Sequence, residues 1–563
     1  MLAIVVAAPL VFWRLGATPF DDPGEGMHAE IARELWLDGR GADLRLNGIR
    51  YVDKPPLLYV LLAGAFAVAG PSEAVARAVP ALASLVAVGA TAWLGARLLG
   101  LAGGLLAAGA LLTSPGFFVY ARYVRPDMLF VAALSVGFSL AVVGIAEDRR
   151  HLAGAGLVAF AVAALAKDPL GAIGPPIVLA GALAAVGRLR PVRRWLPAWA
   201  VVAWVVVGFG WWLAAERAAP GFAWYTVIDN HVLNVARARH FPDEDVPLGA
   251  GPFLVVAAAG ALPWIVAAAA AVVGLVRGRR WRDAAAWPWL VLASWAVAVL
   301  GLTALSPFRL SHYGLPAYPA VALLAAFGWS GQRGRRLLVA HLVLFGVIAL
   351  ACALAWTSGD GATFERRVLA ATDMTTLKTL ASGHVAPGPP WERFQRLLGA
   401  TALVFGVGAG ALVLVARARE PRRLASVTVL GTMLAAAPLV AAGLSVVTDH
   451  RGVRALAADV RGRLGGGDVV AHEGPIENSG ALEWYLGRRP VIVDGRRSVL
   501  GFGATFTDTA AGFWDREELR RGWEGGRRVW LISMRPPERS LVRDLPGTRL
   551  VSSQGGRWLY VNR

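Results

Sequence analysis

Long apolar segments recur along almost the whole of this chain. Most are about 17–25 residues long, the length an α-helix needs to cross about 30 Å of hydrocarbon. Only 17% of the residues are charged and the mean hydropathy is +0.53, which excludes a soluble enzyme, a disordered chain and a disulfide scaffold. The sequence therefore predicts a mainly α, polytopic membrane protein with about thirteen transmembrane helices, near residues 1–16, 74–96, 101–114, 128–146, 152–166, 170–187, 196–214, 251–276, 285–305, 314–330, 337–356, 396–416 and 425–447.

The net charge of +18 is concentrated in short arginine-rich loops between alternate segments, near residues 97, 149–150, 188–194, 277–282, 333–336 and 417–423. Basic loops stay on the cytoplasmic side of a membrane, so the excess charge marks topology rather than a nucleic-acid surface. The segment 17–73, the loops 215–250 and 358–395, and the C-terminus are then expected outside. We expect the first apolar segment to be an uncleaved helix, because no clean small-x-small cleavage site precedes the charged segment.

The sequence pattern changes after about residue 450. Short β-rich runs near residues 468–471, 490–494, 528–532 and 557–561 are separated by turns and by helical stretches such as 515–522. Strands that alternate with helices are typical of an α/β domain. We therefore expect a transmembrane domain over residues 1–450, with interfacial helices in the external loop 17–73, and a small external α/β domain over residues 451–563.

The first polar cluster follows the first apolar segment, where residues 22–25 are Asp-Pro-Gly-Glu. This order predicts a helix start with Asp22 as N-cap and Glu25 in the first turn. Apolar residues at helical spacing from Met27 to Leu35 then predict an amphipathic helix in the membrane interface. A carboxylate held in a cap is also preorganised, so Asp22 and Glu25 are candidates both for capping and for catalysis.

The second cluster is Asp53-Lys54-Pro55-Pro56, which fixes the chain where a second interfacial helix begins. Asp53 and Lys54 have ordinary interpretations as a cap and as a side chain that reaches the headgroups. Lys54 at an external membrane boundary is also well placed to bind a lipid phosphate. Further polar clusters at 125–127, 167–169, 229–231 and 306–313 all fall at external ends of spans, where polar side chains are functional candidates by default.

Taken in order, these clusters resemble the aminoarabinose transferase (ArnT-like) and protein O-mannosyltransferase superfamily of membrane glycosyltransferases, which has the GT-C fold. The resemblance covers essentially the whole chain, and the Asp53-Lys54-Pro-Pro-Leu-Leu segment is its most specific part. The matching segments are 25–34, 47–59, 125–127, 167–171, 220–231, 305–316, 477–479, 485–489 and 502–503.

The resemblance implies transfer of a sugar from a polyprenyl-phosphate donor, such as an undecaprenyl phosphate sugar, outside a bacterial cytoplasmic (inner) membrane and with inversion. The acceptor would be a lipid or a cell-envelope glycan, and lipid A is the acceptor known in this family. The partners are then the donor, the acceptor and membrane lipids, with no nucleic acid.

The resemblance also implies roles for individual residues. Lys54 would bind the donor phosphate, and Asp53 and His231 match metal-ligand positions for a divalent ion, Zn²⁺ or Mg²⁺/Mn²⁺. Asp127 matches a second acidic position near the site. Further substrate-binding or phosphate-binding positions correspond to Tyr59, Arg309, His312 and Tyr313.

This chain departs from the family at one important point. The family has Asp-Glu-x-Arg-Tyr before Ala-Glu-Ile, whereas Gly24 stands here in the column of the Asp and Met27-His28 replace Arg-Tyr. Asp22 or Glu25 would then have to supply the catalytic carboxylate.

Two other functions remain as alternatives. A protein O-glycosyltransferase would use Ser or Thr acceptors in a groove open to polypeptide. A transporter or flippase of a lipid-linked sugar would place ionisable residues near the middle of its spans. The predicted spans are nearly free of charge at mid-depth, which favours a one-sided enzyme site.

Overall fold

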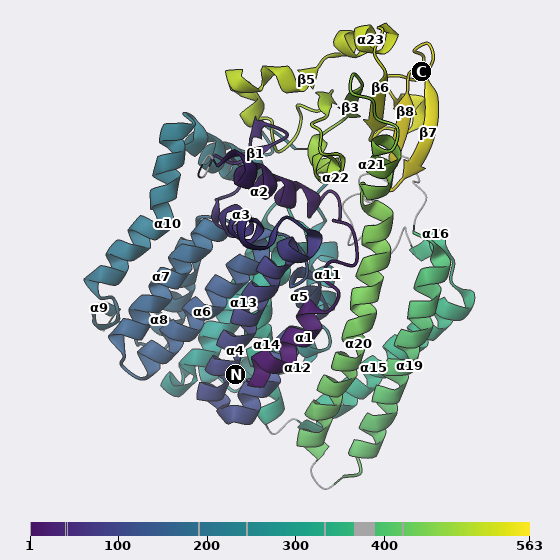
Figure 1. Ribbon diagram of the computed structural model, residues 1–563. Coiled ribbons are helices and arrows are strands. Elements are labelled where there is room, and N and C mark those ends of the chain that lie inside the picture. Colours follow the sequence, from purple (N-terminus) through teal and green to yellow (C-terminus); the bar gives the residue numbers. More distant parts are fainter. Residues whose placement is uncertain are drawn as a thin grey trace.

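A bundle of helices forms most of the molecule, and a mixed β-sheet covers one end of it (Figure 1). The computed structural model describes residues 2–39, 41, 43–189, 192–243, 246–331, 334–364, 389–418 and 421–563. Most of the predicted external loop 358–395 lies outside the described residues.

Seven helices of the described residues are long and apolar enough to cross a membrane, and the bent pair α11 (Ala250–Gly260) and α12 (Trp264–Arg277) makes eight if it is one span. The prediction of a mainly helical, multi-pass membrane protein is confirmed. Length and composition support fewer spans than the thirteen predicted. The seven helices are α4 (Glu73–Thr113), α6 (Pro126–Ala146), α10 (Ala198–Ala218), α13 (Trp287–Leu305), α15 (Gly334–Ser358), α19 (Trp391–Val415) and α20 (Pro421–Arg451).

The smaller number has two structural causes. α4 contains two of the predicted segments, which join at Gly100, where φ is 77° and the backbone is not helical. Other predicted segments form helices of only 11 to 17 residues, because turns and irregular chain take up their ends. These shorter helices are α1 (Leu2–Phe12), α7 (Arg150–Ala166), α8 (Leu170–Ala185) and α14 (Tyr318–Ser330).

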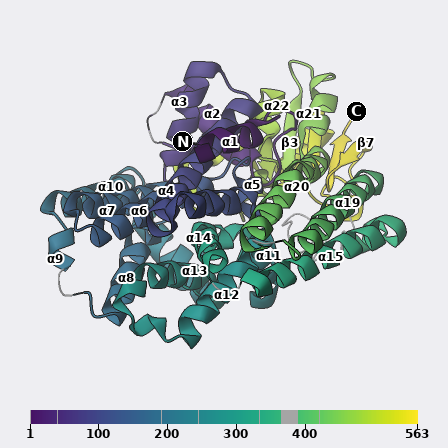
Figure 2. The same cartoon turned by 90° about the horizontal axis from the view of Figure 1, so that it is seen from below.

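The bundle has two distinct sides. Seen along its length, α15, α19 and α20 lie at one side, and α7, α8 and α10 lie at the other (Figure 2). Large apolar side chains such as Val202 and Leu403 are exposed on these outer helices, as contact with lipid tails requires.

The segment after α1 lies between the bundle and the sheet. It forms α2 (Gly26–Asp38), the hairpin β1 (Arg45–Leu46) and β2 (Ile49–Arg50), and α3 (Leu57–Ala69), which begins directly after the two prolines as predicted. The predicted cap at Asp22 is wrong: α2 begins at Gly26, and no side chain caps it. α2 is also buried along most of its length, because α3 and the C-terminal domain enclose it.

The C-terminal domain is a six-stranded sheet in the order β5-β4-β3-β6-β8-β7. β3 pairs in parallel with β4 and β6, and β8 pairs antiparallel with β6 and β7. Four strands confirm the predicted β-rich runs, and β5 and β7 were not predicted. The strands are β3 (Val469–Glu473), β4 (Val491–Val493), β5 (Phe513–Trp514), β6 (Val529–Ser533), β7 (Arg549–Gln554) and β8 (Arg557–Val561).

Alternate residues of the sheet face two different cores, as the pleat requires. One face packs on α23 (Arg516–Glu524), where Leu531 meets Trp523 in a small separate core. The other face shares a core with the N-terminal segment, in which Ile532 belongs to the same cluster as Phe20. The sheet domain is therefore joined to the bundle through packed side chains, whereas the predicted domain boundary at residue 450 stays a prediction.

A tight backbone contact at this junction gives a test. A Cβ added at Gly503 would lie 1.8 Å from the carbonyl oxygen of Arg50 in β2, and a backbone atom cannot easily move away. We expect Gly503→Ala to lower the thermal unfolding temperature of the purified protein in detergent. Gly467→Ala, which has open space around it, is the matched control. Equal unfolding temperatures for the two variants would contradict the packed junction.

Candidate active site

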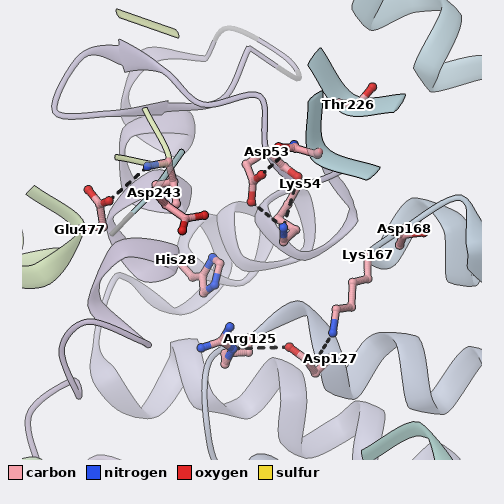
Figure 3. A network of polar contacts seen from close by, with 12 residues as sticks. His28, Asp53, Lys54, Arg125, Asp127, Lys167, Asp168, Thr226, Asp243 and Glu477 are labelled. Atoms are coloured by element: carbon pink, nitrogen blue, oxygen red, sulfur yellow. Dashed lines mark hydrogen bonds and ion pairs between the residues drawn. The ribbon is translucent and has the colours of Figure 1, made fainter. Parts of the chain in front are cut away.

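Charged side chains from four distant segments gather at the end of the bundle that faces the sheet (Figure 3). They come from the loop before α3, the start of α6, the turn between α7 and α8, and the π-helix η1 (Trp224–Leu233). The prolines and glycines at these helix ends break the helices there and so leave short polar turns at one level. The labelled charged residues that surround the centre of this site are Asp53, Lys54, Arg125, Asp127, Lys167, Asp168 and Asp243.

Lys54 lies directly before the two prolines and pairs with its neighbour Asp53. Its Nζ donates to Asp53 Oδ2 over 2.5 Å, and the Asn230 side chain donates to Asp53 Oδ1 over 3.3 Å. Burial alone would lower the pKa of Lys54, but the Asp53 carboxylate outweighs it and raises that pKa. Lys54 is therefore a charged ammonium group at the predicted phosphate position.

Asp127 is buried at the first turn of α6 and holds two cations. Lys167 donates to its Oδ1, and Arg125 Nε lies 3.4 Å from its Oδ2. His312 Nε2 lies 3.8 Å from the same Oδ1. Because cations occupy both carboxylate oxygens, Asp127 is arranged to position Lys167 and Arg125 rather than to accept a proton.

His312 and Tyr313 lie beside this cluster in the 3-10 helix η4 (Ser311–Ala317). His312 Nε2 is 3.1 Å from Arg125 Nη2, and since a guanidinium can only donate, the imidazole nitrogen accepts. Burial and then the charge of Arg125 hold the pKa of His312 well below its usual range. The ring of Tyr313 lies under Lys167, with Nζ 4.7 Å from the ring centre.

His231 does not meet its predicted metal partner Asp53 in this arrangement. Its Nε2 is 3.1 Å from Asp168 Oδ2, and its Nδ1 is 2.6 Å from the carbonyl oxygen of Thr226. The hydrogen bond that His231 donates to the Asp168 carboxylate raises the pKa of His231. Asp53 and His231 are thus each held by protein groups, and the metal ion expected between them stays a prediction.

Among the residues that the structure describes, a different group brings three carboxylates together: Glu30 and Glu34 of α2 and Glu483 of α22 (Leu482–Leu486). Arginines neutralise this group, with Arg33 at 2.6 Å from Glu30 and Arg489 at 2.9 Å from Glu34. Burial raises the pKa of Glu30 to about 8 and that of Glu34 to about 7. We interpret the group as a hydrogen-bonded contact that joins α2 to the sheet domain.

Asp22, a predicted catalytic carboxylate, is fully buried against the sheet domain. It accepts hydrogen bonds from the backbone N–H groups of Ala481, at 3.1 Å, and Val453, at 3.3 Å. Burial raises its pKa to about 7, although Arg557 opposes that shift. These contacts favour a structural role in which Asp22 fastens the N-terminal segment to the C-terminal domain.

Glu25, the second candidate, has both oxygens occupied. Oε1 accepts from Arg77 Nε and from the Val124 N–H, each at 2.9 Å, and Oε2 accepts from Arg77 Nη2 at 2.6 Å. The side chains of both partners are almost completely buried. Glu25 is therefore better placed to join the segment to α4 than to meet a substrate.

The structure also explains why a glycine stands at position 24. A Cβ on Gly24 would lie 2.1 Å from the hydroxyl of Tyr123, which donates to Asp21 Oδ2 over 2.7 Å. The tyrosine thus fills the space into which an aspartate at position 24 would extend.

Arg309, a predicted phosphate ligand, lies in the chain between α13 and η4. It donates to the backbone carbonyls of Leu248, at 2.8 Å, Ala304, at 3.1 Å, and Ser306. These bonds brace the loop that carries His312, and no contact of Arg309 with Lys54 or Asp127 is found among the described residues.

Four residues to which the sequence assigned no role belong to the same site: His28, Arg125, Lys167 and Asp168. The last three were visible as charges beside prolines at span ends, which is a usable signal. His28 stood out in the sequence only as part of the departure from the family pattern, where Met27-His28 replace Arg-Tyr. It lies here next to the predicted substrate residue Tyr59, whose hydroxyl is 2.8 Å from His28 Nδ1.

The sequence and the fold of this chain are similar to those of known membrane glycosyltransferases. Residues 53–212 match the family model described as dolichyl-phosphate-mannose-protein mannosyltransferase. The chain is 28% identical over 340 residues to the undecaprenyl phosphate-alpha-4-amino-4-deoxy-L-arabinose arabinosyl transferase 1 of Pseudomonas fluorescens, across 58% of this chain and 57% of that one. The corresponding transferase of Erwinia tasmaniensis is 25% identical over 345 residues, across 60% and 56%. The matches thus span less than two thirds of these relatives.

The fold matches solved structures over its whole length. The crystal structure of ArnT from Cupriavidus metallidurans bound to undecaprenyl phosphate superposes with a TM-score of 0.79 at 21% identity, covering 100% of this chain and 97% of that one. The apo structure of the same protein gives 0.80 with the same identity and coverage.

The assignment of Glu25 as a structural residue gives a prediction. Glu25→Gln leaves the buried guanidinium of Arg77 without its counter-charge, which costs roughly 3–5 kcal/mol when one partner of a buried pair is removed. We expect a large fall in the unfolding temperature in detergent. Glu147→Gln is the matched control, since it breaks an exposed pair with Arg97. A stable Glu25→Gln variant that loses only its activity would make Glu25 catalytic instead.

Proposed function

We propose that this chain, an ArnT-like protein with the GT-C fold as its sequence indicated, is an integral-membrane glycosyltransferase. It transfers a sugar from a polyprenyl-phosphate donor to a lipid or cell-envelope glycan acceptor. The observation that carries the proposal is the position of Lys54, fixed before two prolines and gathered with Arg125 and Lys167 at one end of the bundle (Figure 3). A transporter would place ionisable residues near the middle of its spans. The charges of this site instead cluster at one end of the bundle, which favours an enzyme over a transporter.

The donor follows from the chemistry of the site and from the relatives. Three cations around one centre suit a phosphate group, and the apolar helices beside them suit a polyprenyl chain. The curated relatives are named for undecaprenyl phosphate aminoarabinose, and ArnT was crystallised with undecaprenyl phosphate. We therefore propose an undecaprenyl-phosphate-linked sugar as the donor.

The reaction breaks the bond between the anomeric carbon and the phosphate oxygen while the acceptor oxygen bonds to that carbon from the opposite face. Negative charge develops on the departing undecaprenyl phosphate, and Lys54, Arg125 and Lys167 stabilise it in a largely buried site. Attack from the opposite face inverts the anomeric carbon.

The acceptor is proposed to be a phosphate group. Asp22, Glu25 and Asp127 are all engaged by hydrogen bonds or cations, which leaves none of them free to take a proton. An ionised phosphate oxygen attacks without needing a general base. Transfer to Ser or Thr of a protein is the second candidate, favoured by the name of the matching family model, and it would require a base. A divalent metal at Asp53 and His231 also stays a prediction, which metal analysis of the purified protein would test.

We also propose that all thirteen apolar segments cross the membrane, so that the site and the domain from residue 451 onward lie outside the cytoplasmic membrane. The single cysteine, Cys352, makes this testable. In a Cys352→Ala background, we expect Arg543→Cys to react with an impermeant maleimide on intact cells. Arg149→Cys, which is similarly exposed but lies in a predicted cytoplasmic loop, should react only after lysis. The reverse pattern would contradict the proposed orientation.

The proposed role of Lys54 predicts the effect of its removal. Lys54→Ala should lower the rate at which undecaprenyl phosphate is released from an undecaprenyl-phosphate sugar by a factor on the order of 100 or more. The reason is that the substitution removes one positive charge that stabilises the negatively charged leaving group. The unfolding temperature should stay near that of the wild type. Arg516→Ala, which removes an exposed positive charge from α23, should keep full activity. Turnover near the wild-type rate in a folded Lys54→Ala protein would remove Lys54 from the site.

A further inference from the structure

His28 is a buried histidine that lies between the two charged pairs of the site. Its ring lies between the Asp53–Lys54 pair and the Arg125–Asp127 pair (Figure 3). Only 2% of the residue is exposed. One nitrogen, Nδ1, is held at 2.8 Å from the Tyr59 hydroxyl, and the other, Nε2, has no hydrogen-bond partner among the described residues.

The neighbours of His28 determine which nitrogen carries its proton. The Tyr59 hydroxyl also interacts with the side chain of Tyr51, and it has a single proton to donate. When the Tyr59 hydroxyl donates that proton to His28 Nδ1, the proton of the neutral ring is on Nε2. We assign this tautomer to His28, with the tyrosine pair, whose ring centres are 5.9 Å apart, on the Nδ1 side of its ring.

The ring also stays neutral. Burial, and then the positive charges of Arg125 and Lys54, hold the pKa of His28 well below its usual range. A neutral imidazole with its proton on Nε2 can donate a hydrogen bond toward the site without adding a further positive charge to those of Lys54, Arg125 and Lys167.

We propose that His28 is a binding residue whose Nε2–H donates a hydrogen bond to a phosphate oxygen of the polyprenyl-phosphate donor. This inference rests on the proposed function. His28 lies between Lys54 and Arg125 (Figure 3). A phosphate that contacts both cations therefore lies next to His28, which supplies a third, neutral hydrogen-bond donor. Tyr59 and Tyr51 act through His28 by fixing its tautomer.

The experiment compares two amide substitutions in the full-length protein in nanodiscs. His28→Gln can place an amide N–H near the position of Nε2, whereas the shorter His28→Asn reaches only the position of Nδ1. The probes are undecaprenyl phosphate and undecaprenol, which share the chain and differ in the phosphate. His151→Asn, at an exposed position at the start of α7, is the matched control.

We expect His28→Asn to weaken undecaprenyl phosphate binding about tenfold, as loss of one hydrogen bond to a charged group does, and to leave undecaprenol binding unchanged. His28→Gln should bind undecaprenyl phosphate with an affinity within about threefold of that of the wild type. The control His151→Asn should have the affinity of the wild type. Wild-type affinity in His28→Asn alongside weak binding in Lys54→Ala would overturn the role of His28 alone. If His28→Asn and His28→Gln both lose affinity for undecaprenyl phosphate and for undecaprenol to the same extent, His28 has only a structural role. A wild-type protein that does not distinguish the two probes would overturn the proposed donor as well.

Discussion

The buried ion pair between Glu25 and Arg77 is the contact on which the position of the site depends. Burying two charges is costly unless all their hydrogen bonds are made, and here Arg77 also donates to the carbonyls of Leu15, Thr18 and Pro19. The pair fastens the N-terminal segment to α4. Asp22 fastens the same segment to the sheet domain through backbone N–H groups. The segment is thus held from both sides.

This arrangement gives Asp22 and Glu25 a structural role away from the cations of the site. Asp22 and Glu25 hold the N-terminal segment in place, and this segment carries Lys54 and His28 to positions opposite Arg125. Two of the cations each form an ion pair with one carboxylate: Lys54 pairs with Asp53, and Lys167 pairs with Asp127. A phosphate can take over part of these contacts when it arrives, because it brings the same kind of charge. The site is therefore suited to an anionic leaving group more than to proton transfer.

Much of the fold was readable from the sequence because apolar length and loop charge act locally. The strands β3, β4, β6 and β8 and the start of α3 were predicted, since Pro-Pro and β-branched runs specify them within a few residues. The short strand β5, the start of α2 and the roles of Asp22 and Glu25 depend on partners far along the chain, such as Ala481 and Arg77. Lys54 was found because its prolines mark it, whereas the role of His28 became visible only beside Tyr59.

The central claim is that this protein consumes a polyprenyl-phosphate sugar. Mass spectrometry of polyprenyl-phosphate lipids from membranes with and without the gene tests it most directly. The account predicts that one polyprenyl-phosphate sugar accumulates when the gene is deleted and returns to its normal level when the wild-type gene is restored. An unchanged lipid profile, under conditions in which the protein is made, would contradict the account.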